Sequence, residues 1–477
     1  MSIQSCANTS TSWTGIYWYT NQLEQNTNFI IRHQYFTVPN SIVQGTPQLQ
    51  SEINGFVTNH VYLTDFTIIL FSLTANFDSF VRLVTIPNFG YQDVDWMNMS
   101  VTDSVASVKR GNCTFPEKCL LAEKYHVKGL LIFNEGTAPD RFQPLQYVEN
   151  NMNATIPAYF LSYNLGMQFV NASDNVSIRM TVNVSDAEII ENICADTVTG
   201  DKTKTIVIGF HSDGVLEGSG INDNDKKSVK CRSYPFYYCL GSGTVGNLVL
   251  ALNLARLLQT CSLNYAPYRY RVRFCWWGVE ELGLLGSIYH VDQISLPTAT
   301  TKGERLQDYL LYLNYDMLAS PNNNFGILDS FAVPPATPEQ ALPGTGRITD
   351  LLHQWFNEQK LSWTKSSIGG GNDFIPLLTK DIAAGGINTE AGGIKSATER
   401  DQNAAMLGIA SGGIANAAYD SCYHQQCDRI TNINPFAYEK VVKAAAYALQ
   451  YTGRLNDLEK WLYPQGRVNY LDLLNKN

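Results

Sequence analysis

The C-terminal half of the chain alternates short, mainly apolar runs with longer stretches of helical periodicity. The apolar runs that predict buried strands are Thr205–Phe210, Tyr270–Trp277 and Leu310–Tyr315. Apolar residues recur at the three- and four-residue spacing of an amphipathic helix in Thr244–Leu258 and Pro435–Tyr451. Strands that alternate with helices in this way indicate a parallel sheet wrapped by helices. We therefore expect an α/β domain from about residue 186 onward.

The first 185 residues have a different pattern. Residues 1–70 mix aromatic and polar positions, with a turn at 45–47 that is followed by a predicted helix to about His60. From residue 71 to about 185, short β-like runs are broken by Gly, Pro and Asn, and a helical stretch is predicted at Pro116–Tyr125. A β-rich region is therefore expected ahead of the α/β domain.

Length, charge and hydropathy exclude several classes of partner. At 477 residues the chain is long enough for two or three domains. The formal net charge of -9 and the absence of a Lys/Arg block argue against a nucleic-acid partner. No apolar run approaches the ~18 residues that a membrane span requires, so we expect none.

Seven Asn-x-Ser/Thr sequons indicate export to a compartment in which glycosylation takes place. They begin at Asn8, Asn98, Asn112, Asn153, Asn171, Asn175 and Asn183. Six of the seven fall between residues 98 and 183, a clustering that chance would not produce. The start of the chain has no apolar signal core. We therefore predict a secreted or vacuolar glycoprotein whose signal peptide is missing from this sequence.

The ten cysteines favour the same compartment, because disulfides persist where the environment is oxidising. The pairs Cys113/Cys119 and Cys422/Cys427 have the spacing of local disulfide loops, with free buried thiols as the alternative. Our further predictions are a Cys231–Cys239 bond, a Cys6–Cys194 bond between domain edges, and a buried free thiol at Cys275 in mid-strand.

Side chains that can bind a metal follow each predicted strand. They are His211, Asp213 and Asp223 after the first strand, Glu280 and Glu281 after the second, Asp316 after the third, and His424 much later in the chain. The carboxyl ends of the strands are where ligand sites form in open α/β sheets. Two imidazoles with several carboxylates suit zinc better than calcium, which takes only oxygen ligands.

The number of candidates favours two zinc ions. One catalytic zinc needs about three protein ligands and an open position, so five ligands fit two ions if one carboxylate bridges them. A further carboxylate beside a ligand can act as general base toward the attacking water, as the adjacent Glu280 and Glu281 allow. Each residue alone has an ordinary alternative, because Glu-Glu pairs are usually solvated and lone histidines usually structural.

Longer strings around these residues resemble the co-catalytic two-zinc aminopeptidases, a family of secreted bacterial leucine-type enzymes and fungal vacuolar aminopeptidase Y. The matching strings are GFHSDGVLEGSGINDN (209–224), GSGTVGNLVLALNLARLL (241–258), RFCWWGVEELGLLGS (273–287), LNYDM (313–317), NDFIPLL (372–378), AAGGINTEAGGIKSA (383–397) and YDSCYHQQCD (419–428). The resemblance covers about 186–450. It implies a zinc exopeptidase fold, α/β with a mixed, mostly parallel sheet, and removal of N-terminal residues from peptides with a free amino terminus.

The resemblance also implies a metal ligand set. His211 and Asp316 would hold one zinc, Glu281 and His424 the other, and Asp223 would bridge the two ions.

Further roles follow from the same match. Glu280 would be the general base, and Asp213 would orient His211 through its second ring nitrogen. Tyr423 would donate a hydrogen bond to the oxyanion that forms from the substrate. The Cys422–Cys427 bond would clamp the loop that carries the second histidine.

Residues 105–185 resemble the protease-associated (PA) domain that is often inserted in these enzymes and usually covers the active-site face. The string VKRGNCTFPEKCLLAEKYHVKGLLIFNEG (108–136) matches its central strand-helix-strand unit. We therefore divide the chain into the N-terminal part of the peptidase domain (1–70), a PA-like insert (71–185), the zinc peptidase domain (186–452) and a C-terminal extension (453–477). Apolar residues in the extension indicate packing on the domain or on a partner, through which an oligomer or assembly could form.

Two departures from the family pattern leave alternatives open. The insertion 225–240 either leans over the substrate cleft, where Tyr234–Tyr238 would favour a large apolar N-terminal residue, or closes a surface loop by a disulfide. Gly371-Asn372 stands where the family commonly has an arginine-containing pair. The main alternative function is therefore a weak or inactive scaffold or binding protein on this fold. A one-zinc, glutaminyl cyclase-like enzyme is the second, against which the complete ligand set argues.

Overall fold

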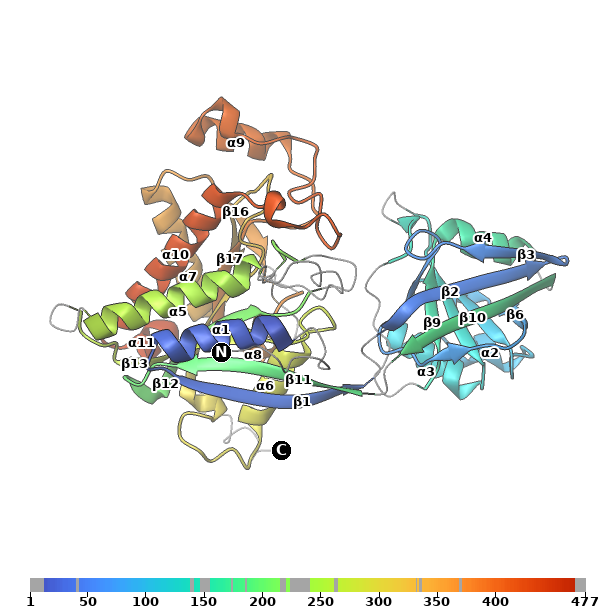
Figure 1. Ribbon diagram of the computed structural model, residues 1–477, viewed down its shortest axis with the longest axis horizontal. Coiled ribbons are helices and arrows are strands. Elements are labelled where there is room, and N and C mark those ends of the chain that lie inside the picture. Colours follow the sequence, from blue (N-terminus) through green and yellow to red (C-terminus); the bar gives the residue numbers. More distant parts are fainter. Residues whose placement is uncertain are drawn as a thin grey trace, which may run out of the picture. The chain divides into compact units, whose positions relative to one another are not determined.

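The computed structural model describes residues 13–39, 43–137, 141–145, 155–172, 175–184, 187–214, 220–223, 241–260, 265–331, 333, 337–368 and 371–467. The chain forms two compact units (Figure 1). The larger unit consists of residues 1–35 and 191–477, and the smaller of residues 36–190. The smaller unit is therefore an insertion in the sequence of the larger one.

The larger unit contains an eight-stranded sheet in the order β1-β11-β13-β12-β14-β17-β15-β16. The strands are β1 (Ile30–Pro39), β11 (Ala187–Asp196), β12 (Asp201–His211), β13 (Tyr270–Trp277), β14 (Tyr309–Tyr315), β15 (Gly326–Asp329), β16 (Thr364–Ser367) and β17 (Ala383–Asn388). The central strands β13, β12, β14 and β17 pair in parallel. β11 is antiparallel to β13, and β15 to β17. The predicted mixed, mostly parallel sheet is confirmed.

Helices cover both faces of this sheet. Residues of α1, α5, α7 and α10 lie in the core on one face, and residues of α6 and α8 in the core on the other. The helices of this unit are α1 (Trp13–Asn26), α5 (Ser242–Thr260), α6 (Leu285–Ser295), α7 (Ala341–Glu358), α8 (Phe374–Leu378), α9 (Ala397–Leu407), α10 (Pro435–Arg454) and α11 (Leu458–Leu462). α10 begins where the Asn434 side chain accepts hydrogen bonds from two helical N–H groups and Pro435 occupies the first turn. The strands predicted at 205–210, 270–277 and 310–315 lie within β12, β13 and β14. The helices predicted at 244–258 and 435–451 lie within α5 and α10.

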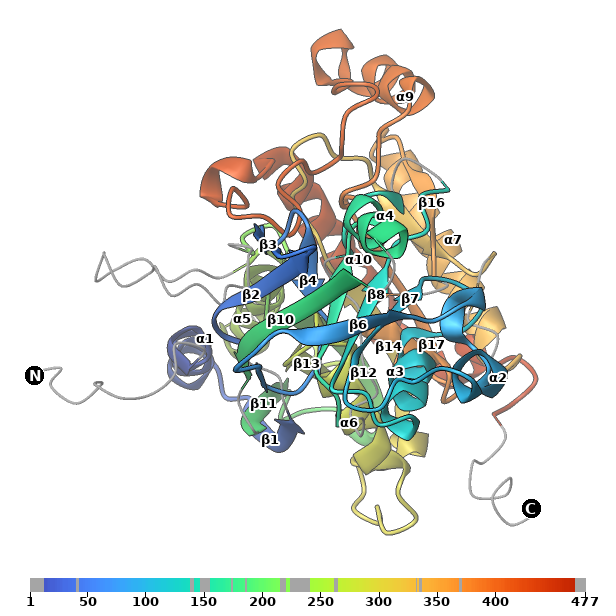
Figure 2. The same cartoon turned by 90° about the vertical axis from the view of Figure 1, so that its right-hand side faces the viewer.

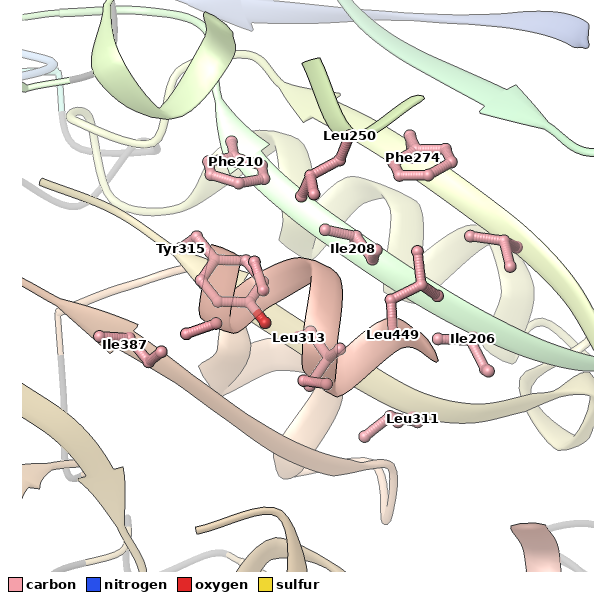
Figure 3. Close-up of a cluster of buried hydrophobic side chains, with 14 of the residues drawn as sticks. Ile206, Ile208, Phe210, Leu250, Phe274, Leu311, Leu313, Tyr315, Ile387 and Leu449 are labelled. Carbon is pink, nitrogen blue, oxygen red and sulfur yellow. The ribbon is translucent and has the colours of Figure 1, made fainter. Parts of the chain in front are cut away.

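Alternate residues of the central strands fill one core on each face of the sheet. Along β12, Ile206, Ile208 and Phe210 belong to one core and Val207 to the other. Figure 3 shows the first core, in which the Phe210 and Tyr315 rings stack with centroids 5.5 Å apart. Burial of one side chain of this size stabilises the folded state by about 2 kcal/mol. The two cores therefore make the sheet a rigid support for the loops at its ends.

The described part of the C-terminal extension packs on the larger unit. Leu458, Leu462 and Tyr463 are buried in the first core. The Tyr463 hydroxyl donates to the carbonyl of Leu310 on β14 at 2.8 Å. Among the described residues, no helix has the length and hydropathy of a membrane span.

The smaller unit has a sheet in the order β3-β2-β10-β6-β7-β8-β9-β4, with β5 paired to β10 (Figure 2). Its strands are β2 (Val43–Ile53), β3 (Phe56–His60), β4 (Phe66–Ile68), β5 (Ala75–Asn76), β6 (Val81–Thr85), β7 (Val105–Lys109), β8 (Gly129–Phe133), β9 (Ala158–Leu161) and β10 (Val176–Val184). The helices are α2 (Asp93–Met97), α3 (Phe115–Lys124) and α4 (Tyr163–Ala172). The predicted β-rich character and the helix near 116–125 agree with this arrangement. Strands β2–β4 precede residue 71, where the insert was expected to begin.

The helix predicted up to His60 is wrong. β2 and β3 form an antiparallel hairpin that turns at Asn54-Gly55. Both turn residues have positive φ, 51° and 82°, as two-residue hairpin turns require, and Asn-Gly is the favoured pair for them. The side chains of β2 alternate between exposed and buried positions around Leu49, which is the period of a strand and not of a helix.

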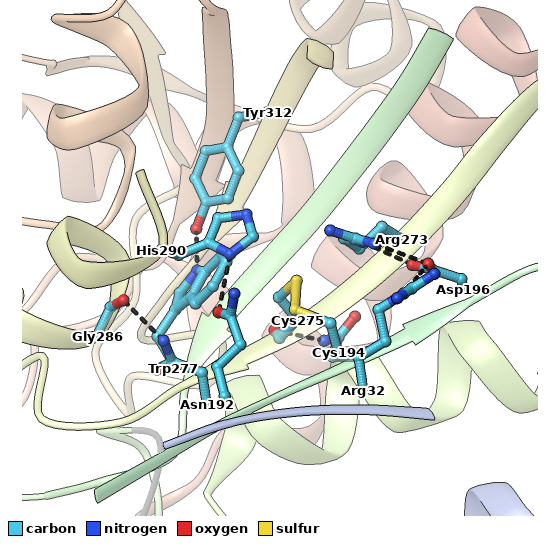
Figure 4. Close-up of a disulfide and its surroundings, with 12 residues drawn as sticks. Arg32, Asn192, Cys194, Asp196, Arg273, Cys275, Trp277, Gly286, His290 and Tyr312 are labelled. Atoms are coloured by element: carbon cyan, nitrogen blue, oxygen red, sulfur yellow. Dashed lines mark hydrogen bonds and ion pairs between the residues drawn. A yellow bond between two sulfur atoms is a disulfide. The ribbon is translucent and has the colours of Figure 1, made fainter. Parts of the chain in front are cut away.

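The cysteine predictions are partly confirmed. Cys422–Cys427 is a disulfide. Cys194 and Cys275 also form one (Figure 4), so the predicted Cys6–Cys194 bond and the free thiol at Cys275 are both wrong. The reason is register, because the two residues lie directly opposite each other on β11 and β13. Cys6, Cys231 and Cys239 lie outside the described residues.

The predicted Cys113–Cys119 bond is wrong as well, since both are free thiols. Cys119 is fully buried on the face of α3 that packs into a hydrophobic core. Cys113 precedes the helix and is half-buried. Burial raises the pKa of the Cys119 thiol to about 12, so this side chain remains a protonated core residue.

A buried ionic cluster joins the edge strands to the sheet (Figure 4). Asp196, whose side chain is 1% exposed, binds Arg273 at 2.6 Å, Arg32 at 2.7 Å and Arg271 at 3.2 Å. Burial opposes its ionisation, but the charges of Arg273 and Arg271 lower the pKa of Asp196 to about 2.

Replacing Asp196 with Ala should lower the free energy of unfolding by about 3 kcal/mol, because three guanidinium groups lose the more deeply buried of the two carboxylates that they share. The other carboxylate, Glu304, remains paired with all three. Since the folded pKa lies below the ~3.9 of an unfolded chain, the stabilisation is present above pH ~4 and is lost as the pH falls toward 2. Urea unfolding at several pH values measures both effects. Asp401→Asn is the matched control, because Asp401 pairs with Arg400 at the surface and should change stability by less than ~0.5 kcal/mol. Equal effects of the two substitutions would contradict the prediction.

Candidate active site

The sequence-predicted ligands lie at the carboxyl ends of the central strands. His211 is the last residue of β12, Glu280 and Glu281 follow β13, and Asp316 follows β14. Parallel neighbours end at the same edge of a sheet, and for this reason residues 70 to 105 positions apart in sequence meet there. Asp223 and His424 lie outside the strands, and their side chains contact His211 and Glu281 at this edge.

The five candidate ligands form one contiguous cluster. His211 Nε2 is 3.3 Å from Asp316 Oδ1 and 3.6 Å from Asp223 Oδ1. His424 Nε2 is 2.8 Å from Asp223 Oδ2 and 3.3 Å from Glu281 Oε2. Asp223 therefore lies between the two imidazoles and presents one oxygen to each.

The donor set of this cluster fits divalent cations. Ligand atoms of His211, Asp223 and Glu281 all lie within 4.8 Å of one another. Within the described residues, the buried Oε1 of Glu281 has no hydrogen-bond partner. Buried carboxylates without such partners are costly unless a cation is bound, and mixed nitrogen and oxygen donors suit zinc.

Charges inside the cluster couple its protonation to cation binding. Burial and the charge of Asp223 raise the pKa of Glu281 to about 8. Burial opposes protonation of His424, but the carboxylate of Glu281 raises the pKa of this imidazole to about 10. A divalent cation bound here would displace these protons, so its affinity should fall at low pH.

Asp213 contacts both His211 and the loop that carries Glu280 and Glu281. Its carboxylate accepts the backbone N–H groups of Glu280 at 2.8 Å and Glu281 at 3.2 Å. Its backbone carbonyl lies 2.9 Å from His211 Nδ1, whereas its carboxylate is 3.6 Å away. Because a carbonyl only accepts, Nδ1 carries the proton and Nε2 keeps its lone pair toward the cluster. The contact to His211 is thus made by the backbone, since the carboxylate is engaged by the loop.

Asn192 on β11 holds both ends of the loop that carries the two glutamates (Figure 4). Its Oδ1 accepts the N–H of Gly278 at 3.0 Å, and its Nδ2 donates to the carbonyl of Gly286 at 2.8 Å. A Cβ added at Gly286 would overlap the Asn192 side chain. Sequence reasoning missed this residue, because its partners are backbone groups that leave no motif.

The Asp223 and His424 loops are fastened to each other. Asp428 accepts the N–H groups of Asn222 at 2.9 Å and Asp223 at 3.2 Å. Asn222 Nδ2 donates to Asp420 at 2.7 Å. The Cys422–Cys427 disulfide closes the His424 loop. These contacts place both ligands with little freedom.

Tyr423 and Asp373 complete the surroundings. The Tyr423 ring stacks on His424 with centroids 3.7 Å apart. Burial raises the pKa of Tyr423 well above its ordinary value, so the phenol remains a hydrogen-bond donor. The buried Asp373 carboxylate accepts from Ser287 Oγ at 2.5 Å, and burial raises the pKa of Asp373 to about 7. Sequence reasoning did not assign a role to Asp373.

Gly371 and Asn372, where the sequence departs from the family pattern, both lie within the described residues. Asn372 Nδ2 donates to Oδ2 of Asp316 and so contacts a candidate ligand directly. Gly371 has φ 79°, a conformation that an arginine would adopt only with strain. The insertion 225–240, with its aromatic run, lies outside the described residues.

Two segments of the chain match known protein families. Residues 241–449 match the model of peptidase family M28, and residues 79–169 match the PA domain. The chain is 31% identical over 355 residues to an aminopeptidase of Pseudomonas aeruginosa strain UCBPP-PA14, a match that covers 73% of this chain and 57% of the relative. It is 28% identical over 394 residues to aminopeptidase Y of Saccharomyces cerevisiae, covering 80% and 62%.

The fold has counterparts among solved structures. A zinc aminopeptidase from Bacillus subtilis superposes with a TM-score of 0.60 at 16% identity, over 95% of this chain and 92% of that one. At this identity the likeness concerns the fold alone. The chain spans less than two thirds of the length of the Pseudomonas and Saccharomyces relatives.

Proposed function

Because this chain carries a peptidase family M28 domain with an inserted PA domain, we propose that it is a two-zinc aminopeptidase that hydrolyses N-terminal residues from peptides. The observation that carries the proposal is the cluster in which Asp223 presents one carboxylate oxygen to each of two imidazoles. His211 and Asp316 would hold one zinc, Glu281 and His424 the other, and Asp223 would bridge them. When bound, the ions would polarise the scissile carbonyl and lower the pKa of water.

Glu280 is the proposed general base. Its carboxylate is buried beside the ligands, and the hydrogen bond from its N–H to Asp213 holds the loop in place. Burial raises the pKa of Glu280 well above its ordinary value. The charge of His211 opposes this shift, and the charge of Glu281 reinforces it. A base of raised pKa takes the proton of the attacking water more readily and can deliver it to the leaving amine.

Tyr423 is the proposed donor to the oxyanion that develops on the substrate. Its protonated phenol lies beside His424, and hence beside the proposed reaction centre. Donors aimed at developing charge contribute substantially to catalysis in buried sites. The carboxylates around the centre would attract the positively charged amino terminus of a peptide, which favours aminopeptidase over carboxypeptidase activity.

We also propose that the protein is exported and glycosylated. All five sequon asparagines within the described residues are exposed, and all belong to the smaller unit. They are Asn98, Asn112, Asn171, Asn175 and Asn183. Two disulfides among the described residues also favour an oxidising compartment.

The function is tested by metal content and hydrolysis measured on the same sample. We expect two zinc ions per chain and fastest cleavage of Leu- or Phe-p-nitroanilide, with loss of activity after treatment with a chelator. N-acetyl-Leu-p-nitroanilide is the matched control and should not be cleaved, because its amino terminus is blocked. A zinc-loaded protein that cleaves no aminoacyl substrate would favour the scaffold function, and cyclisation of N-terminal Gln would favour the cyclase.

A further inference from the structure

A chain of hydrogen bonds runs from the end of β13 to Asp316. Trp277 Nε1 is 2.9 Å from the Tyr312 hydroxyl, which is 3.1 Å from Asn314 Oδ1. Asn314 Nδ2 is 2.7 Å from Asn372 Oδ1. Asn372 Nδ2 contacts Oδ2 of Asp316. Trp277, Tyr312 and Asn314 are buried, so water does not compete for these groups.

The direction of every bond in this chain is fixed by its two ends. An indole N–H can only donate, so the Tyr312 oxygen accepts from Trp277 and its own proton goes to Asn314 Oδ1. Asn314 must then donate through Nδ2 to Asn372. At the other end, the backbone N–H of Asp373 also donates to Asn372 Oδ1, at 2.9 Å. Both ends therefore require the Asn372 amide to direct its NH₂ group toward Asp316.

Gly209 makes the chain possible. It lies on β12, between β13 with Trp277 and β14 with Tyr312. A Cβ added at this glycine would overlap both the Tyr312 hydroxyl and the Trp277 indole nitrogen. The two side chains meet across the strand only because residue 209 has no side chain.

We propose that the chain Trp277–Tyr312–Asn314–Asn372 is a positioning device for Asp316, which it fixes as a one-oxygen zinc ligand. Asn372 occupies Oδ2 of this carboxylate and leaves Oδ1, 3.3 Å from His211 Nε2, to face the cation. Polarised chains of hydrogen bonds strengthen their members, and groups that orient a ligand raise metal affinity. The proposal rests on the proposed zinc function of this site.

The first test is zinc affinity, measured by competition with a chromophoric chelator. Asn372→Ala should weaken one of the two zinc sites by roughly 10- to 100-fold. Tyr312→Phe removes only a hydroxyl that is three hydrogen bonds away from Asp316. It should weaken the same site by roughly fivefold, the equivalent of one hydrogen bond. Cobalt titrations give an independent readout, because the visible spectrum of the ion at this site should change in both variants.

Tyr315→Phe is the matched control. Tyr315 lies on the same strand but on the opposite face, and its buried hydroxyl has no hydrogen-bond partner within the described residues. Its loss should leave zinc affinity and the cobalt spectrum unchanged.

If Tyr312→Phe behaves like Tyr315→Phe, or if Asn372→Ala binds both ions like the wild type, the inference is overturned. Failure of the wild type to bind zinc would instead overturn the proposed function. Should Asn372→Ala not fold, Tyr312→Phe decides alone.

Discussion

Glu280→Gln should lower kcat by about 100- to 10,000-fold, the usual contribution of a general base, while two zinc ions stay bound. Gln has the size and shape of Glu, and the N–H of residue 280 would still donate to Asp213. The loop geometry and the neighbouring ligand Glu281 are therefore preserved. The amide oxygen cannot take a proton from water at neutral pH, and for this reason the loss should be in kcat and not in KM.

The comparison with Glu281→Gln separates the two adjacent glutamates. Glu281 contacts His424 and is proposed as a ligand, so its amide variant should bind less zinc. Steady-state hydrolysis of Leu-p-nitroanilide and elemental analysis of the same samples measure both properties. A Glu280→Gln variant that keeps kcat within tenfold of the wild type would assign the proton transfer to another group.

The elements predicted best from the sequence are those whose pattern of apolar residues fits only one type of secondary structure. β13 is buried at every position, and apolar residues fill six of its eight positions between polar segments. α10 combines an amphipathic pattern with Asn434-Pro435 at its start. The hairpin of β2 and β3 has a weak strand pattern, because alternation is partial in β2 and no residue of β3 is fully buried. The Asn54-Gly55 turn was the signal that could have corrected the predicted helix.

The candidate ligands can be proposed from the sequence, but the groups that hold them in place cannot. His211 ends β12, Glu281 lies shortly after β13 and Asp316 follows β14, so the strand pattern and the family resemblance both point to them. Asn192 donates a hydrogen bond to the backbone carbonyl of Gly286, 94 residues away in the sequence. Asp428 accepts one from the backbone N–H of Asn222, 206 residues away. Their partners are backbone N–H and C=O groups, which every residue possesses.

Disulfide pairing shows the same limit. Cys194 and Cys275 are 81 residues apart, and they pair only because the register of β11 on β13 places them opposite each other. Cys113 and Cys119 are close in sequence, but α3 begins between them and places the Cys119 side chain in a hydrophobic core. Sequence separation is therefore a poor guide to pairing where secondary structure intervenes.

Asp223→Asn should remove activity below detection and lower the zinc content from two ions to one or none. Asp223 contacts both imidazoles, at 3.6 Å and 2.8 Å, and would supply an oxygen to each ion. Asn has nearly the same size, and Asp428 would still hold the loop through the N–H groups of residues 222 and 223. The variant therefore loses the shared negative charge and one ligand oxygen without losing the loop.

The stoichiometries of three variants distinguish a bridged pair of ions from two independent sites. If Asp223 bridges, Asp223→Asn weakens both ions, whereas Glu281→Gln and Asp316→Asn each weaken one and leave the other, because their carboxylates contact different histidines. Zinc is counted by elemental analysis after dialysis against a weak chelator, and affinities by competition. Two tightly bound ions in Asp223→Asn would contradict the bridge, and a wild type with a single ion unaffected by Asp316→Asn would leave only the Glu281–His424 half as a metal site.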